Sequence, residues 1–182
     1  MTIEKVLEER YYPKAEFGRR AIASSIDFLG AWLVSSLFGS NDFGIQIVQI
    51  LVFAASWLVL RVLLPYNNKG QTLGRWLVDL KVLEIERGRI PSLLALTKRE
   101  AIIGLAALLV SIALGNILRN PTAILLVIPL AIDCGAAFSD TQMRQALHDR
   151  YASTMIVSSR RGYSLDLKVK RLVDILQRNV RK

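Results

Sequence analysis

The sequence predicts an all-α membrane protein with four transmembrane helices, arranged as two antiparallel hairpins with both chain termini in the cytoplasm. Three observations lead to this prediction. Of the 182 residues, 52% are hydrophobic, which exceeds the roughly 45–50% typical of soluble domains. These residues are concentrated in four blocks, each long enough to cross a bilayer. The lysines and arginines behind the formal charge of +9 lie mainly in alternate connections between the blocks.

The four predicted spans cover residues 21–38, 45–64, 101–117 and 122–138. Their lengths fit the roughly 17–25 residues that a spanning helix needs. The connection between the third and fourth spans is very short, so these two helices must form an antiparallel hairpin.

Orientation follows from the distribution of lysine and arginine. Five precede the first span, seven lie between residues 66 and 99, and ten follow the fourth span. The connection between the first two spans has none, and the connection between the last two has only Arg119. By the positive-inside rule, both termini and the long connection are cytoplasmic and face anionic lipid. The sequence therefore predicts an integral, multi-pass protein of a bacterial-type inner or internal membrane.

The chain divides into a cytoplasmic leader (residues 1–16), a membrane domain (17–157) and a basic tail (158–182). Between the second and third spans, residues 70–77 are amphipathic and residues 81–86 alternate like a strand before a turn at Arg87-Gly88. This pattern predicts a small surface helix followed by a hairpin. In the tail, apolar residues recur at helical spacing among basic ones, which predicts a basic amphipathic helix.

Ionisable residues are expected to share one layer near the cytoplasmic ends of the helices. Asp27 lies roughly 10 Å inside the first span from Arg20, and Asp133 lies roughly 8 Å from the end of the fourth, at about 1.5 Å per residue. Charges within lipid face the interior of a bundle and pair with one another. The members of this layer are Arg20, Asp27, Arg61, Arg99, Glu100 and Asp133.

The first helix has one face of small and polar residues, which is predicted to face inward because small residues permit close packing in membranes. That face consists of Arg20, Ser24, Asp27, Ala31 and Ser35.

Two interpretations of Asp27 stay open from the residues alone. Asp27 is an ion or proton site, or it is fixed in a pair with Arg20 or Arg61 that sets the packing of the helices. Asp133 is a weaker candidate for an ion site, and a structural role is favoured there. Cys134 is expected to be a packing residue and His148 to be structural.

Several short segments, in order and spacing, resemble the RDD family of small membrane proteins, from about residue 17 to residue 157. The residues from Arg20 to Asp27 look like its signature, an arginine followed by an aspartate seven positions later. Three later segments are also similar to motifs of the family. They are Gly70-Gln71-Thr72-Leu73-Gly74-Arg75 with Leu80-Lys81-Val82, the Arg99-Glu100 pair, and the segment from Arg144 to Arg150 with Thr154.

By this resemblance the second signature aspartate is Asp149, and Asp133 belongs to no motif. Asp149 should then lie at the cytoplasmic surface near Arg20, where a contact between them acts as a clamp or as a gate. For function, the resemblance implies transport, including cation/proton antiport.

Two functions are carried forward. The first is an ion-coupled transporter, expected to be homo-oligomeric, with Asp27 as its site and Arg20 and Asp149 as a cytoplasmic gate. The second is a non-enzymatic accessory or assembly factor that binds a larger membrane protein complex through its helices and basic tail. The sequence has no nucleophile–base motif, phosphate-binding glycine loop or metal-ligand spacing. No enzyme activity, cofactor, metal or nucleic-acid partner is therefore expected.

Overall fold

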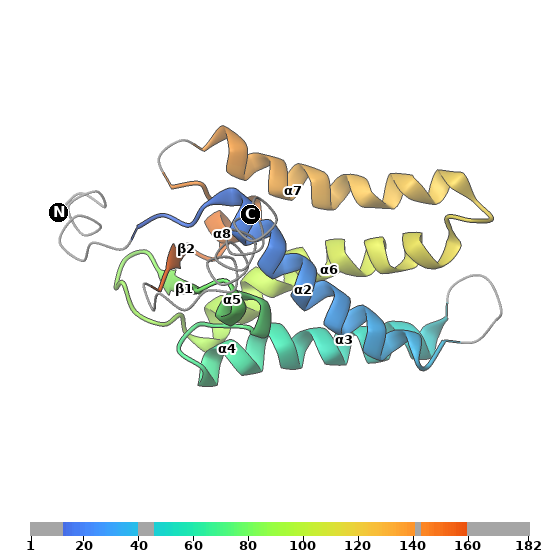
Figure 1. Ribbon diagram of the computed structural model, residues 1–182, viewed down its shortest axis with the longest axis horizontal. Coiled ribbons are helices and arrows are strands. Elements are labelled where there is room, and N and C mark those ends of the chain that lie inside the picture. The colour runs from blue at the N-terminus through green and yellow to red at the C-terminus, as the bar shows by residue number, and fades with distance from the viewer. Residues whose placement is uncertain (1–12, 40–45, 141–142, 160–182) are drawn as a thin grey trace, which may run out of the picture.

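The computed structural model describes residues 13–39, 46–140 and 143–159. The predicted leader (residues 1–16) and basic tail (158–182) lie outside these ranges, except for a few residues at their inner ends. The described chain is mostly helical, with one two-stranded sheet. Its long helical segments run alongside one another, and the short helices and strands gather at one end (Figure 1).

The long helical segments lie close to the predicted spans. The first is α2 (Phe17–Ser36). The second is continuous through α3 (Ile47–Leu58), η1 (Val59–Leu63) and α4 (Leu64–Asn67). The third is α6 (Leu93–Asn116), and the fourth combines η2 (Pro121–Val127) with α7 (Ile128–Ser139).

By length and composition, two of these segments can cross a membrane, Ile47–Asn67 and Pro121–Ser139. The segments α2 and α6 are as long but carry more charge. Helix α6 begins eight residues before the predicted span, so that Arg99 and Glu100 lie inside the helix instead of ahead of it. Its start is set by Ser92, whose side chain accepts a hydrogen bond from the backbone N–H of Ala95 at 3.2 Å.

The second segment contains a π turn at Val59–Leu63. The turn lies directly before Pro65, which lacks an N–H and whose ring would collide with the preceding turn of a regular α-helix. Widening that turn removes the conflict. Arg61 lies in the middle of the π turn and is 2% exposed, so the irregularity coincides with a buried charge.

The predicted hairpin between the second and third spans is wrong. The strand β1 (Leu80–Glu84) pairs antiparallel with β2 (Thr154–Ser158), far along the chain, with Val82 opposite Ile156. The turn at Arg87-Gly88 does form, since the Gly88 N–H donates to the Glu84 carbonyl at 2.8 Å. Pro91 then prevents a returning strand, and the chain enters α6.

The inward face of α2 is rotated slightly from the prediction. The buried residues are Ala23, Asp27, Ala31 and Ser35, at steps of four, whereas Ser24 is exposed. Ala23 is buried because α5 (Leu73–Leu77) packs against it. As predicted for a surface helix, α5 is amphipathic, with Leu73 and Trp76 exposed and Gly74 and Arg75 buried.

Candidate functional site

Asp27 is fully engaged in hydrogen bonds and is only 2% exposed. Its Oδ2 accepts from the Thr72 hydroxyl at 2.6 Å and from Arg61 Nη1 at 3.2 Å. Its Oδ1 accepts from the backbone N–H of Gly74 at 2.8 Å. Of the two arginines considered as its partner, the structure selects Arg61. Asp27 thus connects α2 to the π turn and to the start of α5.

The start of α5 is shaped to receive this carboxylate. Thr72 caps the helix by accepting from the N–H of Arg75 at 3.1 Å while its hydroxyl donates to Asp27. A Cβ at Gly74 would lie 2.1 Å from the carbonyl oxygen of Ala23. Only glycine therefore allows α5 to approach α2 closely enough for its N–H groups to reach Asp27.

Glu100 is the second acceptor of the buried layer. It accepts from Arg61 Nε at 2.9 Å, from Arg99 Nη1 at 3.1 Å and from Arg75 Nη2 at 3.4 Å. The Arg61 guanidinium also lies 4.8 Å from the centre of the Trp57 ring, a cation–π arrangement. Three arginines from different parts of the chain therefore converge on one carboxylate.

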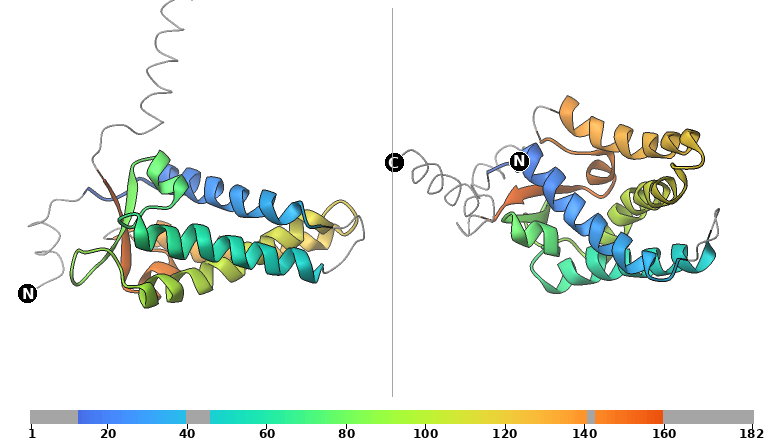
Figure 2. Two further views of the ribbon diagram at one scale, coloured as in Figure 1. Left: turned by 90° about the horizontal axis from the view of Figure 1, so that it is seen from below. Right: turned by 45° about the vertical axis from the view of Figure 1, so that its right-hand side comes forward.

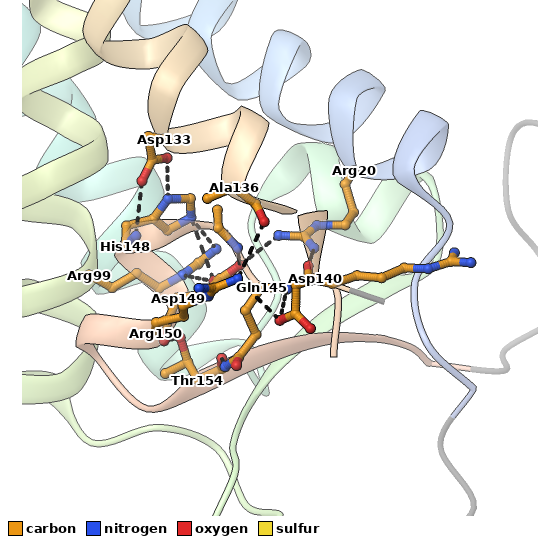
Figure 3. A network of polar contacts seen from close by, with 12 residues as sticks. Arg20, Arg99, Asp133, Ala136, Asp140, Gln145, His148, Asp149, Arg150 and Thr154 are labelled. Carbon is orange, nitrogen blue, oxygen red and sulfur yellow. Dashed lines mark hydrogen bonds and ion pairs between the residues drawn. The ribbon is translucent and has the colours of Figure 1, made fainter. Parts of the chain in front are cut away.

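Asp149 is the third acceptor and lies in α8 (Leu147–Tyr151), with 0% exposure. Arg20 Nη2 donates to it at 2.6 Å and Arg99 Nε at 2.9 Å. Figure 3 shows the two arginines approaching Asp149 from different sides. The contact between Arg20 and Asp149 fastens α8 to the start of α2, the arrangement expected of a clamp or gate.

Asp133 lies away from Asp27 and binds His148. Its Oδ1 accepts from the backbone N–H of His148 at 2.9 Å, and its Oδ2 lies 2.5 Å from Nδ1 of the ring (Figure 3). The other ring nitrogen, Nε2, lies 3.2 Å from Arg99 Nη2. Because arginine can only donate, we assign Nε2 as the acceptor and place the ring proton on Nδ1, where it donates to Asp133.

All six residues of the predicted charge layer belong to one network, which also includes Asp149. The links run from Asp27 through Arg61 to Glu100, then through Arg99 to Asp149 and Arg20, and through His148 to Asp133. Sequence reasoning gave no site role to Arg75, Thr72 or Gly74, although the Thr72-Leu73-Gly74-Arg75 segment was noticed as a motif. It expected a structural role for His148 but did not pair it with Asp133.

The pKa values of Asp149 and Arg75, which lie at the end of the bundle with α5 and α8, are shifted by their neighbours. Burial disfavours the charged form of Asp149, but its basic neighbours, of which Arg99 contributes most, together outweigh burial and hold the pKa of Asp149 well below its usual value. Burial, followed by the like charges of Arg99 and Arg61, lowers the pKa of Arg75. Arg75 has the weakest bond to Glu100, and its Nη1 has no hydrogen-bond partner among the described residues.

The network can hold helices in position, and each oxygen of its carboxylates accepts at least one hydrogen bond. Among the described residues, no group of three or more His, Cys, Asp or Glu side chains is placed to hold a metal ion. Cys134 is partly buried on α7.

Comparison with known proteins supports one assignment. No curated protein and no solved structure matches the chain. A family model described as the RDD family matches residues 14–153, which include all of the chain from α2 to α8 that the structure describes. The match takes in Arg20, Asp27 and Asp149, the residues on which the resemblance depends, and the chain therefore belongs to the RDD family, as a small membrane protein.

Proposed function

We propose that the protein is a non-enzymatic accessory or assembly factor of a membrane protein complex. It spans the bilayer four times, through α2, the segment from α3 to α4, α6, and the segment from η2 to α7. Both termini are cytoplasmic, and the membrane is a bacterial-type inner or internal one.

The four-span topology is supported by the outer surfaces of the helices. Each long segment exposes large apolar side chains, for example Leu33, Leu51, Leu105 and Ile132, which are 56–63% exposed. Lipid can cover such side chains at no cost. The charge network then lies toward the cytoplasmic face, where the positive-inside count places the lysine-rich and arginine-rich connections.

The observation that carries the proposal is the saturation of Asp27. An ion-exchanging carboxylate must gain and lose a proton or cation during each cycle. Asp27 would have to leave Arg61, Thr72 and Gly74 together, and breaking a buried ion pair costs about 3–5 kcal/mol. The carboxylate is better suited to fixing α5 and the π turn against α2. Ion transport at Asp27 is the competing function.

The test is purification of the full chain from its native membrane in mild detergent. We expect a complex of fixed stoichiometry that is lost when residues 164–182 are deleted. A second variant, whose tail is scrambled at constant composition, keeps the positive charge of the tail but loses its helical pattern. If the scrambled chain also loses the complex, the tail docks through its sequence; if only the deletion loses it, positive charge is sufficient.

Reconstituted liposomes provide the opposing measurement. We expect the wild-type chain and the Asp27→Asn variant to give the same proton flux, at the level of protein-free liposomes. Proton-coupled cation flux that disappears in a folded Asp27→Asn variant would overturn the proposal in favour of transport, as would a homo-oligomer with no other component.

A further inference from the structure

A cavity of about 560 Å³ lies inside the bundle, next to the charge network. Its floor is α6, where Ile103 and Ala107 are buried, and its walls come from α2 and from η2 with α7. This volume falls within the roughly 300–1,000 Å³ of typical ligand pockets. Its lining is mostly apolar, apart from the end where the arginines lie.

The charged side chains that line the cavity are all basic. They are Arg20, Arg61 and Arg99, with His148 beside them. The carboxylates that pair with these arginines, Asp27, Glu100 and Asp149, do not line it. An arginine has five N–H donors, and Arg20 uses two nitrogens for Asp149 and for the carbonyl of Arg144. The cavity thus offers cationic donors at one end only.

The entrance opens toward lipid. Lining residues on α2 and α7 are exposed, including Ser24, Leu29 and Ala131. At the cytoplasmic end, the rings of Phe17 and Phe138 lie 3.8 Å apart and join α2 to α7. Farther along, α7 lies against α6 and away from α2 (Figure 2). A molecule would therefore enter between α2 and α7 from the bilayer.

We propose that this cavity binds one anionic phospholipid, with its phosphate at Arg20, Arg61 and Arg99 and an acyl chain along α6. Charge and polarity both match: a phosphate suits planar guanidinium donors, and the apolar walls suit a hydrocarbon chain. The depth also matches, because the arginines lie toward the cytoplasmic end of the helices. This inference rests on the topology proposed above.

The test uses a substitution that fills the cavity without touching the network. Ala131→Trp places a large ring on the lining of α7, whereas Ile132→Trp, one residue away, places it on the lipid-facing side, since Ile132 is 60% exposed and does not line the cavity. The full chain is loaded in detergent with equal amounts of phosphatidylglycerol and phosphatidylcholine, and retained lipid is measured by native mass spectrometry.

We expect wild type and Ile132→Trp to retain about one phosphatidylglycerol per chain, favoured about tenfold over phosphatidylcholine. We expect Ala131→Trp to retain at least about tenfold less phosphatidylglycerol, which corresponds to about 1.4 kcal/mol of binding free energy. Equal retention of the two lipids, retention of neither, or equal retention by the two variants would overturn the lipid site. The complex isolated in mild detergent is scored separately. A wild-type chain that keeps its complex but does not retain phosphatidylglycerol counts against the lipid site alone, and a wild-type chain that retains the lipid but yields no complex counts against the accessory function alone.

Discussion

The two ends of the helical bundle are held together in different ways. At the end with α5, α8 and the sheet, helices are joined by directional bonds from arginines to Asp27, Glu100 and Asp149. Toward the other end, contacts are apolar, with Ala31, Phe53, Trp57, Ile103 and Ala107 forming one core cluster, and α7 is separated from α2 by the cavity. In lipid, burying apolar surface between helices gains little, because lipid tails are equally apolar. The charge network therefore determines the relative positions of the helices, and the helices pack at the apolar end in the arrangement that the network sets.

The largest effect is expected for Asp149→Asn, because it removes the carboxylate that Arg20 binds and one of the two that Arg99 binds. Removing one partner of a buried ion pair costs about 3–5 kcal/mol, so most of the folded fraction should be lost. Unfolding in detergent, followed by circular dichroism, measures it. Glu16→Gln, an acid-to-amide change at an exposed position, is the matched control and should be neutral. Similar stability of the two variants would show that the network does not determine helix positions.

A smaller effect is expected for Gly74→Ala. The added Cβ would lie 2.1 Å from the Ala23 carbonyl oxygen, so α5 must move away from Asp27, at a cost of about 1–3 kcal/mol typical of overpacking. The matched control is Gly135→Ala on α7, where a Cβ meets nothing within 4 Å. We expect the control to be neutral or stabilising by up to about 1 kcal/mol, the helix propensity difference. Unfolding in detergent, followed by circular dichroism, measures the stability of both variants. Equal losses of stability at Gly74 and Gly135 would contradict the close approach of α5 to α2.

The smallest effect on stability is expected from a change of pH, through the protonation of Asp149. The folded pKa of Asp149 lies below its unfolded value of about 3.9. The contribution of Asp149 to the free energy of unfolding is therefore complete above the unfolded pKa and is lost as pH falls from there toward the folded pKa. Stability should thus be insensitive to Asp149 between pH 7 and pH 5, and should fall in more acidic solution. Arg20→Gln removes one arginine from Asp149 but leaves Arg99, so the folded pKa of Asp149 should rise toward its unfolded value, and the acid-dependent loss of stability should be smaller than in the wild type and end at a higher pH. Superimposable pH profiles for wild type and Arg20→Gln would argue against this pairing.

Residue number and the rise per residue were enough to group six charged residues as one predicted layer, and the structure joins these six in one network. The sequence did not predict partners, since depth does not specify the direction in which a side chain points. Asp27 and Asp133 share a depth but bind different groups, Arg61 and His148. The pairing of β1 with β2 was missed because segments so far apart in the chain leave no local signal of contact. Arg75 was missed because the positive-inside rule already accounts for a basic residue in a connection that is predicted to be cytoplasmic.

The contact between Arg20 and Asp149 has a consequence for biogenesis. The two residues are 129 positions apart, and synthesis at about 5–20 residues per second separates their appearance by several seconds or more. Every long helix that the structure describes is made before the carboxylate that joins Arg20 to Arg99 exists. The network can therefore be completed only after residue 149 has been synthesised, and a chain truncated before that residue would leave Arg20 without this carboxylate and Arg99 with Glu100 alone.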